Sequence, residues 1–130
     1  MIKRRRTWIA ERALRVGGGP ERVTVRVARP YEVAESEWVC HVELRQGEAV
    51  TGTDVRGSDA FQSMILAMKV IRSQLDALGQ PTTWEGGEPG DAGFPSYIPD
   101  LFGLDFTRRL ERLVATETER FAAARKPRAR

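Results

Sequence analysis

Apolar and polar residues alternate along three segments in the first half of the chain, and this period of two predicts three β-strands. The first strand is expected over residues 8–16. Its inner face is formed by Trp8, Ala10, Leu14 and Val16. Arg12 interrupts this face, and we interpret it as the mark of a β-bulge.

Glycine and proline separate the segments that follow. A Gly-Gly-Gly-Pro turn at residues 17–20 leads into a second strand over residues 23–27, which Pro30 ends. The glutamate-rich residues 30–37 are expected to form a loop.

The third strand has the clearest alternation in the chain. Its inner-facing residues are Trp38, Cys40, Val42 and Leu44, and its outer-facing residues are Val39, His41, Glu43 and Arg45. A turn at residues 46–48 leads into a weakly patterned fourth strand over residues 49–55. Consecutive strands joined by turns predict an antiparallel meander, and the mixed charges suit a solvated outer face.

The period changes to that of a helix after Ser58, which is the expected N-cap, with Asp59 favourable at the positive end of the helix dipole. The expected stripe, apolar except at position 72, is Phe61, Met64, Ile65, Met68, Ile71, Arg72, Leu75 and Leu78. Gly79 and Pro81 end the helix. Twenty helical residues span roughly 30 Å, so the helix is long enough to cover the inner face of the sheet.

Residues 79–103 contain glycine and proline throughout and carry several aromatic residues, which predicts an ordered loop. A second helix is expected over residues 105–124, with Asp105 as its cap. Its apolar side is formed by Phe106, Leu110, Leu113, Val114 and Phe121.

The predicted fold class is therefore α+β: a three- to four-stranded antiparallel meander with a long helix packed on one face and a second, C-terminal helix. We expect a single domain over residues 8–124. It lies between a basic N-terminal arm, residues 1–7, and a basic disordered tail, residues 125–130.

Charge is distributed unevenly behind the net value of +3. Residues 1–30 carry a net charge of +7, residues 31–100 of −8, and residues 101–130 of +4. The basic character therefore comes from the two ends, and the middle of the chain is acidic.

The chain has one cysteine, Cys40, and one histidine, His41, which excludes an internal disulfide and a cysteine-based metal cluster. Neighbouring strand residues point to opposite faces, so the two are not expected to bind one ion or to act as nucleophile and base. The glycines at residues 17–19 lack the GKS/T ending of a phosphate-binding loop. We expect a non-enzymatic protein without metal or cofactor.

Charged residues interrupt the segment that would form the apolar core of a signal peptide: Glu11, Arg12 and Arg15. The longest apolar run covers only residues 64–68, far less than the roughly 20 residues of a membrane span. One cysteine agrees with a reducing compartment. We expect a cytoplasmic protein that does not associate with a membrane.

Several short motifs resemble those of a family of small bacterial proteins of unknown function. They are Glu11-Arg12 with Leu14, Trp38-x-Cys40 with Glu43, Asp59-Ala60-Phe61-Gln62, Trp84-Glu85-Gly86, Gly93-Phe94-Pro95 and Arg109-Leu110-Glu111. The resemblance covers about residues 8–114 and leaves out the basic ends. It implies this fold and a bacterial origin and no activity, since the family has none established. By analogy, proteins of this size also occur as immunity partners of bacterial toxins.

Two features predict a protein-binding surface. The first is a set of acidic residues that would steer a basic partner: Glu32, Glu35, Glu37, Glu48 and Asp54. Alternatively, these residues form a solvated loop or pair with the basic ends. The second feature is Trp84 and Tyr97, as exposed anchors or as plugs of the open end of the core. The leading hypothesis is a non-catalytic protein-binding module. Its favoured form is a toxin-neutralising immunity-type protein that occludes a basic toxin domain.

The alternative hypothesis is a nucleic-acid-associated accessory protein. Its phosphate-binding residues would be those of the two ends: Lys3, Arg4, Arg5, Arg6, Arg125, Lys126, Arg128 and Arg130. Such binding would be non-specific and would weaken steeply with salt. Otherwise the two ends are solubilising tails.

Overall fold

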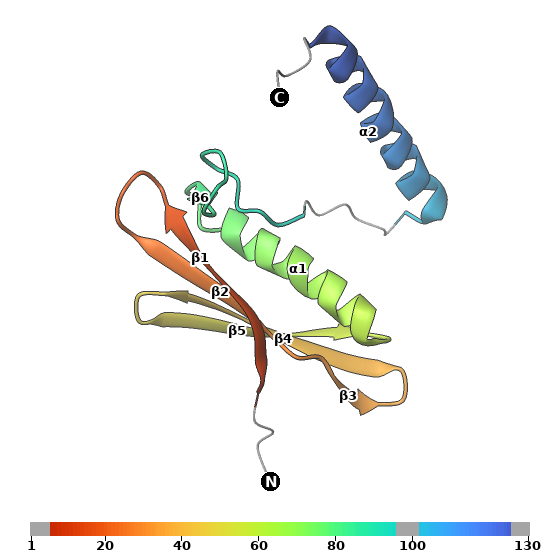
Figure 1. The fold of residues 1–130 in the computed structure, drawn as a ribbon. Coiled ribbons are helices and arrows are strands. Elements are labelled where there is room, and N and C mark those ends of the chain that lie inside the picture. Colours follow the sequence, from red (N-terminus) through yellow and green to blue (C-terminus); the bar gives the residue numbers. More distant parts are fainter. Residues whose placement is uncertain (1–5, 96–101, 126–130) are drawn as a thin grey trace. The chain divides into compact units, whose positions relative to one another are not determined.

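The computed structural model describes residues 6–95 and 102–125, which divide after Tyr97 into two compact units. The N-terminal unit contains a six-stranded antiparallel sheet and a helix, and the described part of the C-terminal unit contains one helix (Figure 1). The predicted α+β class is confirmed, with six strands in place of the three or four that the sequence indicated. The single domain over residues 8–124 stays a prediction.

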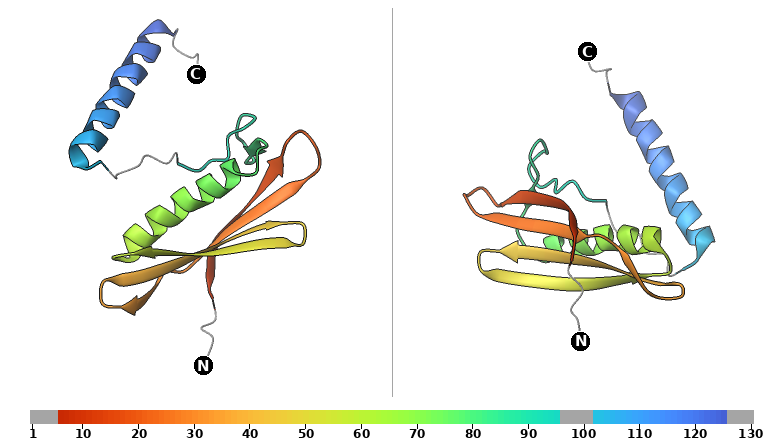
Figure 2. Two further views of the ribbon diagram at one scale, coloured as in Figure 1. Left: turned by 180° about the vertical axis from the view of Figure 1, so that it is seen from behind. Right: turned by 60° about the horizontal axis from the view of Figure 1, so that its bottom comes forward.

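The strands are β1 (Trp8–Val16), β2 (Arg22–Ala28), β3 (Tyr31–Ala34), β4 (Glu37–Gln46), β5 (Ala49–Gly57) and β6 (Thr82–Thr83), and the helices are α1 (Ala60–Asp76) and α2 (Leu104–Ala124). β5 pairs with β4 along its whole length. β2 and β3 pair with successive parts of β4, β1 pairs with β2, and β6 pairs with the end of β1. α1 lies across one face of this sheet (Figure 2), which we call the inner face.

β3 occupies residues for which the sequence predicted a loop. Tyr31 pairs with Val39 and Glu32 with Trp38 of β4, and Ser36 reverses the chain with a positive φ of 55°. The loop prediction was wrong because strand propensity depends on context. Tyr31 and Val33 suit a strand, and the neighbouring β4 supplies the ladder hydrogen bonds that hold these four residues in one.

A β-bulge lies in β1 between Trp8 and Ala10, nearer the N-terminus than Arg12. Because a bulge sets two residues against one, it reverses the face to which the preceding side chain points. Trp8 accordingly contacts Arg26 and His41 on the outer face, at 3.8 Å and 5.9 Å from its ring centroid. Its assignment to the inner face was wrong.

The hydrophobic core lies between the inner face and α1. The buried strand residues are Leu14, Val16, Val23, Val25, Val27, Cys40, Val42, Leu44 and Val55, and the helix contributes Ala67, Ile71 and Leu75. Helix and sheet approach closely where the side chains are small. A Cβ added to Gly57 would lie 2.5 Å from the backbone nitrogen of Ser63, so glycine is required there for the packing of α1.

This close packing rotates α1 relative to the stripe that the sequence predicted. Its fully buried positions are Ser63, Ala67, Ile71 and Leu75. Two residues of the predicted stripe, Phe61 and Ile65, are instead 75% and 56% exposed. We predicted their burial because they are hydrophobic. The smaller Ser63 and Ala67 face the sheet instead, because they let the helix approach it more closely and make more contacts.

The helix ends differ slightly from the expected ones. Asp59, and not Ser58, caps α1, because its side chain accepts a hydrogen bond from the backbone nitrogen of Gln62 at 2.7 Å. α2 begins after Gly103 without a side-chain cap, which leaves Asp105 in its first turn. Within the described ranges, neither helix combines the length and apolar composition that crossing a membrane requires.

Candidate functional site

The hairpin of β3 and β4 brings three of the predicted acidic residues to one end of the sheet. Glu32 on β3 and Glu35 in the turn are exposed, and among the described residues neither has an ion-pair partner. Glu37 begins β4 and forms an ion pair with Arg56. We call Glu32, Glu35 and Glu37 the acidic hairpin. It presents, on a hydrogen-bonded element, two carboxylates that no described residue pairs with.

The other two acidic residues lie elsewhere. Glu48 is exposed in the turn between β4 and β5, at the opposite end of β4 from Glu37. A ten-residue strand spans roughly 33 Å. Asp54 lies in the middle of β5 and contacts His41. The five residues therefore do not form one surface, because nearness in the sequence does not place residues at the same end of a strand.

His41 and Asp54 form a polar pair on the outer face that the sequence analysis missed. His41 Nδ1 lies 2.6 Å from Asp54 Oδ1, and the two side chains are 9% and 50% exposed. His41 was expected on a solvated outer face, and this expectation was wrong, because the residue is buried. The turn at residues 47–48 contained the missed signal, because it sets Gln46 against Ala49 and so aligns residues 41 and 54.

The surroundings of His41 hold its ring in place. Trp8 lies on one side, and a Cβ on Gly52 would lie only 3.2 Å from Nε2. Arg26 connects this group to Glu43 through an ion pair of 2.9 Å. A carboxylate at Nδ1 fixes the orientation of an imidazole ring, and here the pair joins β4 to β5.

Cys40 points to the inner face and is fully buried. Its Sγ donates a weak hydrogen bond to the carbonyl oxygen of Ala28 at 3.5 Å. Burial raises the pKa of the thiol to about 11, so the nucleophilic thiolate is scarce at neutral pH. His41 lies on the other face and cannot act as its base.

Arg12 lies on the inner face of β1 and holds the loop that follows β6. Its guanidinium donates hydrogen bonds to the carbonyl oxygens of Ala92 at 3.3 Å and Gly93 at 2.9 Å. It also lies between the rings of Trp84 and Phe94, at 5.0 and 4.8 Å from their centroids. Arg12, which interrupts the apolar face of β1 in the sequence, therefore has a structural role. We call residues 91–94 the latched loop.

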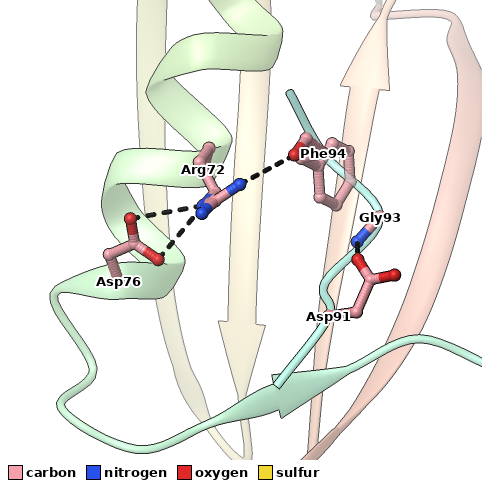
Figure 3. A network of polar contacts seen from close by, with 5 residues as sticks. All are labelled: Arg72, Asp76, Asp91, Gly93 and Phe94. Carbon is pink, nitrogen blue, oxygen red and sulfur yellow. Dashed lines mark hydrogen bonds and ion pairs between the residues drawn. The ribbon is translucent and has the colours of Figure 1, made fainter. Parts of the chain in front are cut away.

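A second arginine holds the latched loop from α1. Arg72 donates a hydrogen bond to the carbonyl oxygen of Phe94 at 2.9 Å and pairs with Asp76 at 3.2 Å (Figure 3). Asp91 accepts a hydrogen bond from the backbone nitrogen of Gly93 at 2.8 Å (Figure 3). The loop is thus fixed to both the sheet and the helix.

Two aromatic residues of this region, Trp84 and Phe94, pack against the core. Trp84 is half-buried, and its Nε1, enclosed beside Gly87, has no hydrogen-bond partner among the described residues. This placement favours the interpretation of Trp84 as a plug of the core. Tyr97 lies outside the described residues.

The basic ends are described only in part. Arg6 is exposed, and Arg125 lies over the ring of Phe121, 4.7 Å from its centroid. The remaining residues of the predicted phosphate-binding set lie outside the described residues: Lys3, Arg4, Arg5, Lys126, Arg128 and Arg130.

The described residues were compared with the ligand sets of metal sites, and the chain with known proteins. Across residues 6–95 and 102–125, no three His, Cys, Asp or Glu residues come together as possible metal ligands. No curated protein and no solved structure matches the chain. The model of one family matches residues 10–96, from within β1 to just past the latched loop. The chain therefore belongs to this family, which is described as a domain of unknown function, DUF6968.

Proposed function

We propose that this protein is a non-catalytic protein-binding module that recognises a basic partner through the acidic hairpin. The observation that carries the proposal is the pair of exposed carboxylates of Glu32 and Glu35, which have no ion-pair partner within residues 6–95 and 102–125. They are displayed by β3 and a tight turn, which β4 fixes by backbone pairing. Carboxylates on an ordered backbone lose little freedom on binding and complement a positive surface.

We propose further that the module is an immunity-type protein that neutralises a basic toxin domain by occlusion. The charge of −8 over residues 31–100 supports a basic partner, because such a field accelerates encounter and discriminates between partners. Glu48 and Asp54 contribute to this field from outside the contact surface.

The state of the two most reactive side chains supports a role without covalent chemistry. The thiol of Cys40 is buried with a raised pKa, and the ring of His41 is held by Asp54 on the opposite face. A nucleophile needs an activating base within hydrogen-bond reach, and this pair of neighbours cannot provide one.

The proposal is tested by affinity capture of the tagged full chain from the cells that encode it, at low and high salt. We expect one basic protein to be captured and lost when both Glu32→Lys and Glu35→Lys are introduced. The matched control is Glu48→Lys, a charge reversal of an exposed residue at the other end of β4, which should retain the partner. Equal loss in both variants would contradict recognition by the acidic hairpin, and recovery of nucleic acid alone would favour phosphate binding by the basic ends.

A further inference from the structure

α2 carries an apolar stripe that the described residues of its own unit cover only at the N-terminal end, where Phe102 packs against Phe106. The stripe consists of Phe106, Leu110, Leu113, Val114 and Phe121. The last three are 58%, 59% and 57% exposed, and α2 is the only regular element among the described residues of its unit. An isolated helix with such a stripe is marginal in water, so a partner surface would stabilise it.

Glu117 lies on the same side of α2 as the stripe, and with it the spacing of the positions is the same in both directions. Positions 106, 110, 113, 114, 117 and 121 follow one another at intervals of four, three, one, three and four residues. Reversing the helix exchanges Phe106 with Phe121 and Leu113 with Val114. A stripe with this symmetry fits an identical stripe that runs in the opposite direction. We propose that α2 is a self-association surface, on which α2 of a second copy packs antiparallel about an axis between Leu113 and Val114.

The two ends of α2 are complementary in the same arrangement. At the N-terminal end, Phe102 and Phe106 form an edge-to-face pair at 5.4 Å, beside a hollow that also involves Asp105. At the C-terminal end, Arg125 lies over Phe121. Reversal brings Phe121 of one copy to Phe106 of the other and Arg125 to Phe102. A guanidinium then meets aromatic rings and the carboxylate of Asp105, and the contact occurs twice.

Glu117 is the polar position of the stripe, and its charge fits the same arrangement. In one copy it pairs with Arg120 at 3.4 Å. In the antiparallel pair it faces Leu110 of the second copy, and the neighbouring Arg109 brings a second positive charge to it. A charged residue within an apolar seam lowers the stability of the pair and specifies its register.

The association is tested by sedimentation equilibrium of the full chain. We expect a dimer for the native sequence and a monomer for Leu113→Glu, with the fluorescence of the N-terminal unit unchanged. Ala115→Glu, on the opposite side of α2, is the matched control and should remain a dimer. Glu117→Leu should lower the dissociation constant by about tenfold, because it removes two partly buried carboxylates from the seam. A monomeric native chain, or equal disruption by Ala115→Glu, would overturn the proposal.

The orientation is tested by disulfide formation under a mild copper oxidant. The native Cys40 is buried and is not expected to cross-link. Val114→Cys lies near the axis and should cross-link to itself. Phe106→Cys should not, because the two copies of position 106 lie roughly 22 Å apart along the helix. It should instead cross-link to Phe121→Cys when the two variants are mixed. Self-cross-linking of Phe106→Cys would indicate a parallel pair and sink the antiparallel arrangement.

Discussion

His41 and Asp54 face each other across the β4–β5 hairpin, with Nδ1 of the ring 2.6 Å from Oδ1 of the carboxylate. The pair lies on the face of the sheet that α1 does not cover, and the ring of Trp8 lies 5.9 Å from that of His41. Since the histidine side chain is 9% exposed, its Nδ1 needs a protein group as hydrogen-bond partner, because little water reaches it. The outer face thus has a small packed centre of its own.

Asp54→Ala should lower the free energy of unfolding by about 1–2 kcal/mol, because it leaves the buried Nδ1 of His41 without its acceptor. Urea unfolding followed by tryptophan fluorescence measures the change. Glu48→Ala, at an exposed turn, is the control and should change the stability by less than about 0.5 kcal/mol. Equal stabilities of the two variants would show that the pair contributes nothing measurable.

Gly57→Ala should destabilise the fold by about 1–3 kcal/mol or more, because the added methyl would meet backbone atoms of α1 that cannot rotate away. The new Cβ would lie 2.5 Å from the nitrogen of Ser63 and 2.9 Å from its Cα. Thermal unfolding measures the loss. Gly18→Ala, where nothing lies within 4 Å, should leave the melting temperature nearly unchanged, and a comparable drop there would refute the packing argument.

The thiol of Cys40 should react with a disulfide reagent only as fast as the N-terminal unit opens, because burial raises its pKa to about 11. The reaction rate should then increase with urea concentration in the same way as the extent of unfolding does. Fast reaction of the native protein would show that the thiol is accessible.

The same shift of the Cys40 pKa predicts a change of stability with pH. Well below pH 9.0, the ordinary pKa of the thiol, the side chain is protonated in both states and its contribution to the stability is constant. As the pH rises from 9.0 towards about 11, the unfolded chain loses the proton first, so the free energy of unfolding falls, by on the order of 2 kcal/mol. The difference between the native sequence and Cys40→Ala isolates this slope, and parallel curves would contradict it.

Arg12→Lys should loosen the latched loop although it preserves the charge. A single guanidinium nitrogen, Nη1, reaches both carbonyl oxygens, and an ammonium group lacks the planar face that lies between Trp84 and Phe94. Hydrogen exchange should become faster at the amides of Trp84 and Asp91, which are hydrogen-bonded within this region, and remain unchanged in β4. The control is Arg15→Lys, at an exposed position of the same strand, which should alter neither.

The sequence predicted the elements of this fold better than their orientation. Strands and helices were found because their periods of 2 and 3.6 residues reflect burial on one face. Trp8 was placed on the wrong face because a one-residue bulge reverses the phase of a strand without leaving a mark in composition. Phe61 and Ile65 were expected in the core because hydrophobicity was weighed above size, whereas Ser63 and Ala67 bring the helix close to the sheet.

The candidate site was predicted as a list of charges and not as a surface. Glu35 and Glu48 are close in the sequence but lie at opposite ends of β4, since a strand separates the two turns that carry them. The partner of His41 was predictable in principle, because the two-residue turn fixes the register of β4 and β5. The role of Arg12 was not, because its contacts lie 80 and 81 residues away in the chain.

The hydrogen bond between Arg12 and Gly93 brings the first strand of the family segment into contact with its last loop. A chain whose ends meet in this way can be joined at those ends and opened at another exposed turn. We expect a circular permutant that connects Pro95 to Trp8 through a short glycine linker, and that begins within the turn at residues 17–20, to form the same sheet. The strand with which the chain begins is then not essential to the family fold, because the same contacts form when the chain starts at another turn.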